Sequence, residues 1–266
     1  MIYYFSATGN SKHVADRLAE ALDTKSQSIE TASAEILLAD GEPLGIVTPT
    51  NWNQLPVLVR EFIKKAEFRL AKDNYVFTVA TYGAIQGMVC EDARRELKRK
   101  GVTMNAGFSV KMPDNWTPMF DLSDPVKVQK QVDAAEPQIE EVISLIAQRV
   151  QGNHSKDRMP YFLHSLTNKL LDYERQTKFF GVDGSSCIGC GLCARKCPVQ
   201  AIEMQETAKT ETNKSGRRPA WILERCALCL GCLHRCPKFA INYNNKTQKH
   251  GQYLHSKYYK KDSYSL

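Results

Sequence analysis

The 266-residue sequence lacks a long apolar run. No stretch approaches the roughly 18 consecutive apolar residues that a membrane-spanning helix needs. A basic leader is absent as well, because the apolar residues 2–5 pass directly into Ser6. We therefore expect a protein with no membrane span that stays in the cytoplasm.

The sequence also lacks a recognisable helix for reading nucleic acid. Its formal net charge is +7, and much of that charge lies after residue 243, where Lys246, Lys249, Lys257, Lys260 and Lys261 face only one aspartate. A basic stretch without a folded reading element is typical of a solvated tail. We expect no nucleic-acid partner, although a basic surface also favours acidic protein partners.

Cysteine is almost absent from the first 186 residues, where Cys90 stands alone. The other eight cysteines lie between residues 187 and 236. Without an export signal, clustered thiols in a reducing compartment indicate metal binding rather than disulfides. Cys90 has no neighbouring cysteine, and we interpret it as a small buried residue.

The length favours two compact units. Up to about residue 120, short apolar runs alternate with amphipathic stretches, as in a parallel sheet with crossover helices. The expected strands are residues 2–5, 25–29, 44–48, 76–81 and 106–110. The expected helices are residues 12–22, 56–68 and 91–100. This pattern predicts an α/β fold with a doubly wound parallel sheet.

The middle of the chain predicts helices and a linker. Asp124 and Pro125 are typical of a helix start, and the helix should run to about residue 150 with a break at Pro137. Residues 151–158 are polar and favour a linker. A connecting helix should follow, with a packed apolar stripe formed by Phe162, Leu163, Leu166, Leu170 and Tyr173. The expected domains are residues 1–150, a linker and connecting helix at 151–179, a cysteine-rich domain at 180–243 and a basic tail at 244–266.

The cysteine-rich region contains an internal repeat. The run CIGCGLCARKCPVQAIEM, starting at Cys187, aligns without gaps on CALCLGCLHRCPKFAINY, starting at Cys226. Both runs obey C-x-x-C-x-x-C-x-x-x-C-P, which supplies three thiolates from one loop and a fourth from elsewhere, as an iron-sulfur cube requires. Zinc is the competing metal, but structural zinc uses two short C-x-x-C pairs and needs neither a third equally spaced cysteine nor a trailing proline.

The repeat resembles the two-cluster bacterial ferredoxin family across about residues 180–243. The resemblance implies a small α+β domain with two 4Fe-4S clusters, in which the last cysteine of each run ligates the other cluster. One cluster is then held by Cys187, Cys190, Cys193 and Cys236, and its mate by Cys226, Cys229, Cys232 and Cys197. Gly189, Gly191 and Gly231 suit a backbone that approaches the cluster closely. Residues 206–218 are an insertion that departs from the family, and we expect this departure to bear on partner docking but not on ligation.

A hydroxyl-rich turn between the first strand and the first helix is a candidate phosphate site. It comprises Ser6, Ala7, Thr8, Gly9, Asn10 and Ser11. Hydroxyls, backbone amides and the helix dipole bind a phosphate there without any lysine. The turn lacks the ending of a nucleotide-binding P-loop and is too short for the dinucleotide fingerprint. A simple helix cap is the alternative.

This turn resembles the T-x-T-G-x-T phosphate loop of the flavodoxin family, with Ser6 and Ser11 in place of threonine. The resemblance implies strand order 2-1-3-4-5 and an FMN ring at the carboxyl ends of the strands, between the loops that follow the third and fourth strands. These loops contain Pro49, Thr50, Asn51, Trp52 and Asn53, and then Thr81, Tyr82, Gly83 and Ala84.

Within those loops, the resemblance assigns roles to individual residues. Trp52 and Tyr82 are expected to stack on the flavin, unless they serve ordinary loop packing. Thr81, Gly83 and Ala84 offer backbone amides to the ring edge. Asn51 or Asn53 takes the place of the glycine that flavodoxins often have beside the flavin N5. Residues 111–116 should lie near the same rim, and for Trp116 a structural role is favoured over one on the path between the redox centres.

Together the two halves resemble flavodoxin-ferredoxin fusion proteins, which are known chiefly from anaerobic bacteria and archaea. The resemblance implies an electron-transfer flavoprotein that serves redox partner proteins of the ferredoxin, flavodoxin or reductase type. The alternative is a ferredoxin-type flavin reductase acting on a small molecule, for which the loops supply only Tyr82, Asp114 and hydroxyls as acid-base groups. A redox or iron sensor is a third hypothesis, which a DNA-reading helix would favour.

Overall fold

The computed structural model describes residues 1–259, and their contacts divide them into two compact units. Unit 1 comprises Met1–Pro113 and Gln129–Lys169, and unit 2 comprises Asp114–Val128 and the residues from Leu170 onward. Residues 260–266, the last part of the expected basic tail, lie outside the described residues. Among residues 1–259, no helix combines the length and the apolar composition that crossing a membrane requires.

Unit 1 is built on a six-stranded sheet in which every neighbouring pair is parallel. The order is β2-β1-β4-β6-β7-β8. The strands are β1 (Ile2–Tyr4), β2 (Ser26–Ser28), β4 (Leu44–Pro49), β6 (Val76–Tyr82), β7 (Ala106–Lys111) and β8 (Gly152–Asn153). Taken in chain order, the first five give the order 2-1-3-4-5, so the predicted doubly wound sheet is confirmed.

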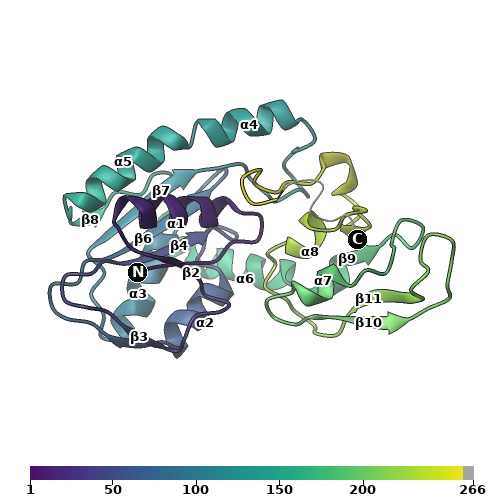
Figure 1. Ribbon diagram of the computed structural model, residues 1–266, viewed down its shortest axis with the longest axis horizontal. Helices are drawn as coiled ribbons and strands as arrows, with labels where there is room; N and C mark the ends of the chain where they lie inside the picture. The colour runs from purple at the N-terminus through teal and green to yellow at the C-terminus, as the bar shows by residue number, and fades with distance from the viewer. Residues whose placement is uncertain (260–266) are drawn as a thin grey trace. The chain divides into compact units, whose positions relative to one another are not determined.

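Helices cover both faces of this sheet (Figure 1). Helices α1 (Asn10–Ala21) and α5 (Glu136–Ala147) pack on one face, and α2 (Val57–Lys65) and α3 (Val89–Arg99) pack on the other. Because both faces are covered, every residue of β6 is buried. The apolar core on the α1 side contains Ile2, Leu18, Phe77, Phe108 and Ile139, among others.

The structure contains short strands that the sequence analysis did not anticipate. β3 (Glu35–Leu37) pairs in parallel with β5 (Glu67–Arg69), and Ala66 is extended, so α2 ends before residue 68. The polar segment 151–158 contributes β8 at the edge of the sheet, where Gly152 N donates to Asn105 O at 2.8 Å. These strands have partly exposed or polar residues, and their sequences therefore lack the apolar pattern that marks a buried strand.

The predicted break in the long helix is confirmed, and it lies just before Pro137. Helix α4 (Pro125–Asp133) ends first, and Pro137 then falls within the first two positions of α5, where no backbone donor is needed. The carboxylate of Asp124 accepts hydrogen bonds from Val126 N and Lys127 N, as a helix cap does. Glu136, at the start of α5, contacts His13 and Arg17 of α1.

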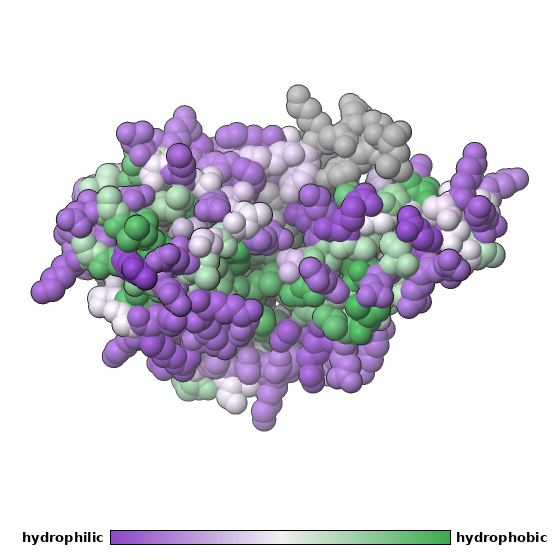
Figure 2. All heavy atoms as spheres, turned by 60° about the horizontal axis from the view of Figure 1, so that its bottom comes forward, coloured by the Kyte–Doolittle hydropathy of each residue, from purple (hydrophilic) through white to green (hydrophobic). Residues whose placement is uncertain are grey.

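The connecting helix forms as α6 (His164–Glu174), but its predicted apolar stripe is not buried. Phe162 is 82% exposed and Leu166 is 58% exposed, whereas Thr167 and Leu171 are buried. Gln54 Nε2 donates to Thr167 Oγ1 at 2.7 Å. One face of the molecule is mostly hydrophilic, with apolar atoms in separate patches (Figure 2).

Unit 2 consists of two antiparallel strand pairs and two short helices. β9 (Phe180–Val182) pairs with β12 (Ile241–Tyr243), and β10 (Ile202–Glu206) pairs with β11 (Arg217–Trp221). Helices α7 (Leu192–Arg195) and α8 (Gly231–His234) occupy equivalent positions in the two halves of the repeat. Single turns of 3-10 helix lie at Tyr161–Leu163, Thr177–Phe179 and Gln248–His250.

Two segments outside the expected cysteine-rich domain pack within unit 2. In residues 114–128, Asn115 O accepts a hydrogen bond from His234 Nε2 at 2.8 Å, and the Trp116 ring lies 5.2 Å from that of Tyr243. In residues 244–259, Tyr253 and His255 are buried, and Tyr253 N donates to His234 Nδ1 at 3.2 Å. Trp116 therefore has a packing role in this unit.

A buried ionic cluster joins α2 to α3 in unit 1. The side chains of Asp92 and Glu96 are only 1% and 2% exposed. Arg60 of α2 reaches both, at 3.3 Å from Asp92 Oδ2 and 2.7 Å from Glu96 Oε1. Asp92 Oδ2 also accepts a hydrogen bond from Leu55 N, next to one of the candidate flavin loops. Removing Arg60 would leave two buried carboxylates with fewer partners.

We expect Arg60→Leu to lower the free energy of unfolding by about 3 kcal/mol, because it breaks a buried ion pair. Lys64→Leu is the matched control on the same helix, since the Lys64–Glu61 pair is exposed and such pairs contribute at most about 1 kcal/mol. Urea denaturation of both variants measures the difference. Equal losses would show that the Arg60 cluster does not hold α2 on α3.

Candidate cofactor sites

The candidate phosphate loop links β1 to the start of α1. Gly9 is the residue before the helix and has a φ of 105°, and its N-H donates to Ser6 Oγ at 3.0 Å. The first turn of α1 contains no acidic residue, so the positive end of the helix dipole is not offset there. Thr8 and Ser11 are buried hydroxyl residues. This arrangement fits a phosphate dianion.

Hydrogen bonds join the phosphate loop to the loops that follow the neighbouring strands. Ser11 Oγ lies 2.8 Å from Thr81 Oγ1, and Thr50 N donates to Thr81 O at 3.0 Å. Asn10 Nδ2 donates to Pro113 O at 3.1 Å. The predicted residues 6–11, 49–53 and 81–84 thus lie at one edge of the sheet, at the carboxyl ends of its parallel strands.

The loop after β4 is a tight turn centred on Trp52. Asn51 and Gln54 exchange two backbone hydrogen bonds, of 3.1 and 2.9 Å. Trp52 and Asn53 have φ values of 46° and 63°, as a type I′ turn requires. A tryptophan in this region is disfavoured by about 1 kcal/mol, so packing must hold it there. Of the two asparagines considered as glycine substitutes, Asn53 has the left-handed backbone.

Because Gly87 has no Cβ, this turn packs closely against the residues at the start of α3. A Cβ on Gly87 would lie 2.6 Å from Asn53 Cα and closer still to its carbonyl oxygen. That carbonyl accepts a hydrogen bond from Met88 N at 2.7 Å, while Gly87 N donates to Asp157 O at 3.0 Å. Sequence reasoning missed Gly87, because nothing in the run Ile85-Gln86-Gly87-Met88 marks a close approach.

Tyr82 is held by a partner that sequence reasoning also missed. Its hydroxyl donates to Asp157 Oδ2 at 2.9 Å, and the side chain is buried. Burial first, and the carboxylate of Asp157 second, raise the pKa of Tyr82 to about 12. Beyond it, Gly83 is half-buried and Ala84 is exposed. The backbone of residues 83–84 therefore lies at the accessible rim, whereas the Tyr82 hydroxyl is directed at Asp157.

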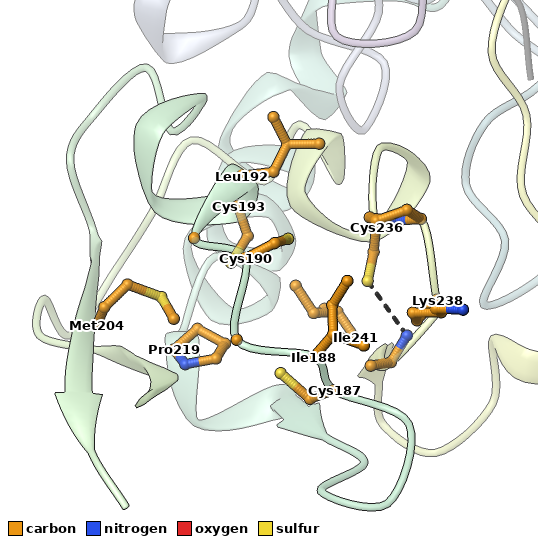
Figure 3. A pocket seen from close by; sticks show the side chains of 14 residues that line it. Cys187, Ile188, Cys190, Leu192, Cys193, Met204, Pro219, Cys236, Lys238 and Ile241 are labelled. Carbon is orange, nitrogen blue, oxygen red and sulfur yellow. Dashed lines mark hydrogen bonds between the residues drawn. The ribbon is translucent and has the colours of Figure 1, made fainter. Parts of the chain in front are cut away.

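The eight clustered cysteines line two cavities, and each cavity takes three thiols from one half of the repeat and one from the other. The first is lined by Cys187, Cys190, Cys193 and Cys236 (Figure 3). The second is lined by Cys226, Cys229, Cys232 and Cys197. The two cavities have the same volume, about 20 Å³ each. Most of the other lining residues are apolar.

The backbone around the two cavities follows the repeat. Gly189 and Gly191 have φ values of 67° and 72°, and the equivalent Leu228 and Leu230 have 52° and 53°. Gly231, which we expected to serve close approach, instead begins α8 and is not left-handed. The shape of the loop therefore imposes the left-handed backbone conformation at these two positions. In the second half of the repeat, leucines adopt this conformation.

Backbone amides already donate to the sulfurs. Ala201 N donates to Cys197 Sγ at 3.2 Å, and the equivalent Ala240 N donates to Cys236 Sγ at 3.3 Å. Leu228 N donates to Cys226 Sγ at 3.3 Å. Such bonds stabilise negative charge on sulfur and tune the reduction potential of a bound cluster.

The donor set fits an iron-sulfur cluster better than a single ion. Burial first, and the neighbouring cysteines to a smaller extent, raise the pKa of Cys193 and of Cys226 to about 12. Cationic iron supplies the charge that keeps such thiols deprotonated. Within residues 1–259, no three His, Cys, Asp or Glu side chains are close enough to hold one metal ion. Four thiols around one cavity match the ligand set of an iron-sulfur cluster.

Residues 1–138 match the family model of the flavodoxin domain, which is more than half of the chain. The chain belongs to the flavodoxin family. Residues 186–240 match the 4Fe-4S dicluster domain. The chain thus combines an N-terminal flavodoxin domain with a C-terminal dicluster domain, as in flavodoxin-ferredoxin fusion proteins.

Two curated relatives resemble the dicluster domain. A ferredoxin of Pyrobaculum islandicum is 35% identical over 74 residues, which are 28% of this chain and 57% of the relative. An uncharacterised polyferredoxin-like protein of Methanocaldococcus jannaschii is 38% identical over 58 residues, or 21% of this chain and 34% of the relative. The matches thus span only part of each relative.

A solved structure, rubredoxin oxygen:oxidoreductase from the anaerobe Desulfovibrio gigas, is similar over 53% of this chain and 35% of its own. The sequence identity is 15% and the TM-score is 0.34. That likeness is too weak to bear on the fold or the function.

Cys90 of the flavodoxin domain lies in the packed interior of that domain. It is fully buried, and its Sγ donates to Phe108 O at 3.3 Å. Burial raises the pKa of the Cys90 thiol to about 12. A Cβ on Gly107 would lie only 2.9 Å from Cys90 Cβ, so the site is tightly packed. This thiol lacks the exposure and low pKa of a reactive cysteine.

The acid-base groups of the flavodoxin domain bear on the alternative of a flavin reductase. The hydroxyl of Tyr82 has a raised pKa and is protonated at neutral pH. Asp114 belongs to unit 2, where its Oδ1 accepts a hydrogen bond from Trp116 N at 3.0 Å. The Tyr82 hydroxyl therefore lacks the pKa near neutrality that is typical of a general acid or base.

We expect Gly87→Ala to displace the Asn51–Gln54 turn and to weaken FMN binding about tenfold, or about 1.4 kcal/mol. Gly101→Ala is the matched control, because Gly101 has a similar φ of 75° but nothing within 4 Å of its added Cβ. Flavin fluorescence titration of the apoprotein measures both affinities. If the two variants bind FMN equally well, the turn does not depend on the contact at Gly87.

Proposed function

We propose that the chain is an electron-transfer flavoprotein that relays electrons between two 4Fe-4S clusters and FMN, and onward to redox partner proteins. The observation that carries the proposal is the pair of four-thiol cavities, each completed by a cysteine from the other half of the repeat. The flavodoxin domain supplies the second redox site.

In this proposal, Cys187, Cys190, Cys193 and Cys236 hold the first cluster, and Cys226, Cys229, Cys232 and Cys197 hold the second. The amides of Ala201 and Ala240 stabilise charge on the sulfurs that cross between the halves. The apolar lining, which includes Ile188 and Met204 in the first cavity, limits the access of water.

The phosphate of FMN is proposed to lie against residues 6–11 at the start of α1. Ser6 and Thr8 contribute hydroxyls, and the backbone that follows Gly9 contributes amides. Trp52 is the aromatic residue best suited to stack on the ring, because the Tyr82 hydroxyl is bound to Asp157. The exposed backbone of residues 83–84 is available to the ring edge.

The two proposed kinds of cofactor differ in the number of electrons that they exchange. When bound, FMN exchanges two electrons, whereas each cluster exchanges one. Joining both domains in one chain raises the effective concentration of one redox site at the other. The partners are proposed to be carriers or reductases of the ferredoxin, flavodoxin or flavoprotein type, which the two domain families support.

Anaerobically purified protein is expected to contain one FMN, about eight iron and about eight sulfide per chain. Cys236→Ala should remove the cluster whose other ligands are Cys187, Cys190 and Cys193, leaving about four iron. Cys90→Ala is the control and should retain the full iron content. Two zinc ions in place of iron would contradict the proposal.

Paired substitutions test the crossed ligation directly. If Cys190 and Cys236 serve the same cluster, the double variant Cys190→Ala/Cys236→Ala should retain the same iron as either single variant. The double variant Cys229→Ala/Cys236→Ala should lose both clusters. Iron analysis and low-temperature paramagnetic resonance report the outcome, and the reverse pattern would show that each half ligates its own cluster.

A further inference from the structure

The insertion between the two halves, residues 206–218, folds back on its own tip. Asn213 is 1% exposed, and its backbone N-H and both polar atoms of its side chain form hydrogen bonds. Its Nδ2 donates to Arg217 O at 2.8 Å, its backbone N donates to Thr210 Oγ1 at 2.9 Å, and its Oδ1 accepts from Ser215 Oγ at 2.7 Å. Because the buried side chain of Asn213 has its hydrogen bonds satisfied, it holds the tip of the insertion in one conformation.

This tip lies directly on the first cysteine loop. Ser215 Oγ donates to Gly189 O at 3.3 Å. A Cβ on Gly189 would lie 2.5 Å from Asn213 Oδ1, 2.6 Å from Arg217 O and closer still to Ser215 Oγ. Gly189 lies between Cys187 and Cys190 and lines the first cavity. The insertion therefore contacts the segment that supplies two of the four thiols.

The repeat shows why residue 189 is glycine. The equivalent Leu228 has nearly the same left-handed backbone, with a φ of 52° against 67° at Gly189, and it carries a full side chain. Backbone conformation alone therefore does not require glycine at this position. The feature that sets Gly189 apart is the approach of Asn213, Ser215 and Arg217, which leaves no room for a Cβ.

We propose that residues 206–218, called the lid below, position the Cys187–Cys190 loop, so that the first cluster is held differently from the second. The inference rests on the proposed function, because it takes the cysteines to be cluster ligands. The second cavity is lined differently, by Phe180 and Trp221 among others, whose rings stack at 5.0 Å. The insertion is thus a positioning element for one of two otherwise equivalent sites.

The lid should affect the first cluster through the Cys187–Cys190 loop. Removing it frees that loop, so the midpoint potential of the first cluster should shift. Loosening the loop should also speed iron loss, because groups that support metal ligands affect metal binding about tenfold or more. The second cluster should change in neither respect.

The first experiment compares Asn213→Ala with Lys214→Ala in the full-length holoprotein. Asn213→Ala should speed iron loss to a chelator about tenfold for one cluster only and shift the potential of that cluster alone. Lys214→Ala alters an exposed neighbour in the same tip and should match the wild type. Ser215→Ala removes the hydroxyl that bonds to Asn213 Oδ1 and Gly189 O and should also affect only the first cluster.

The second experiment asks whether the lid is the reason for the glycine. Gly189→Ala should destabilise the first cluster in the full-length protein and have a smaller effect when residues 207–216, which supply the contacts of Asn213 and Ser215 but not that of Arg217, are replaced by a two-residue turn. Such non-additivity reveals a direct contact. Additive effects, or equal changes in both clusters, would overturn the inference.

Failure of the lid can be told apart from failure of the proposed function. Wild-type protein without iron would overturn the proposed function. Amide hydrogen exchange of the segment containing Gly189 tests the lid without reference to iron, and it should become faster in Asn213→Ala than in Lys214→Ala. Unchanged exchange would show that the tip does not hold the loop.

Discussion

The dicluster domain depends on one geometric constraint, which is that four thiols must surround each cavity while a single tight loop supplies only three. The fourth, Cys197 or Cys236, comes from the other half of the repeat. Neither half can therefore complete a four-thiol cavity alone. Because burial raises the pKa of the Cys193 and Cys226 thiols to about 12, we expect metal binding and folding of this domain to be coupled.

Close backbone approach shapes the candidate sites in both domains. Gly87 admits the turn that carries Trp52, and Gly189 admits the tip of the insertion. In each case a neighbouring segment lies too close for a Cβ, so the position requires glycine. Other left-handed backbone positions are occupied by residues with full side chains, such as Trp52, Leu228 and Leu230. Left-handed backbone at such residues concentrates where a structure holds a ligand.

Much of the architecture could be predicted from the sequence, because buried parallel strands such as residues 76–81 form continuous apolar runs and cysteine spacing encodes loop geometry. The strand order followed from the resemblance of the phosphate loop to that of flavodoxins, and the start of α4 at Pro125 followed from the capping carboxylate of Asp124. Other features had no such signal. β8 is polar, and the contacts of Asp157 with Tyr82 and of Asn213 with Arg217 join residues whose sequence contexts carry no motif. Such pairs are fixed by tertiary packing.

The central claim is that each cluster is ligated across the repeat. Anomalous diffraction at the iron absorption edge, from crystals grown without oxygen, tests this claim most directly. The account predicts two four-iron peaks, one bonded to the sulfurs of Cys187, Cys190, Cys193 and Cys236 and the other to those of Cys197, Cys226, Cys229 and Cys232. A peak that joins Cys197 to Cys187, or anomalous signal at the zinc edge instead, would contradict it.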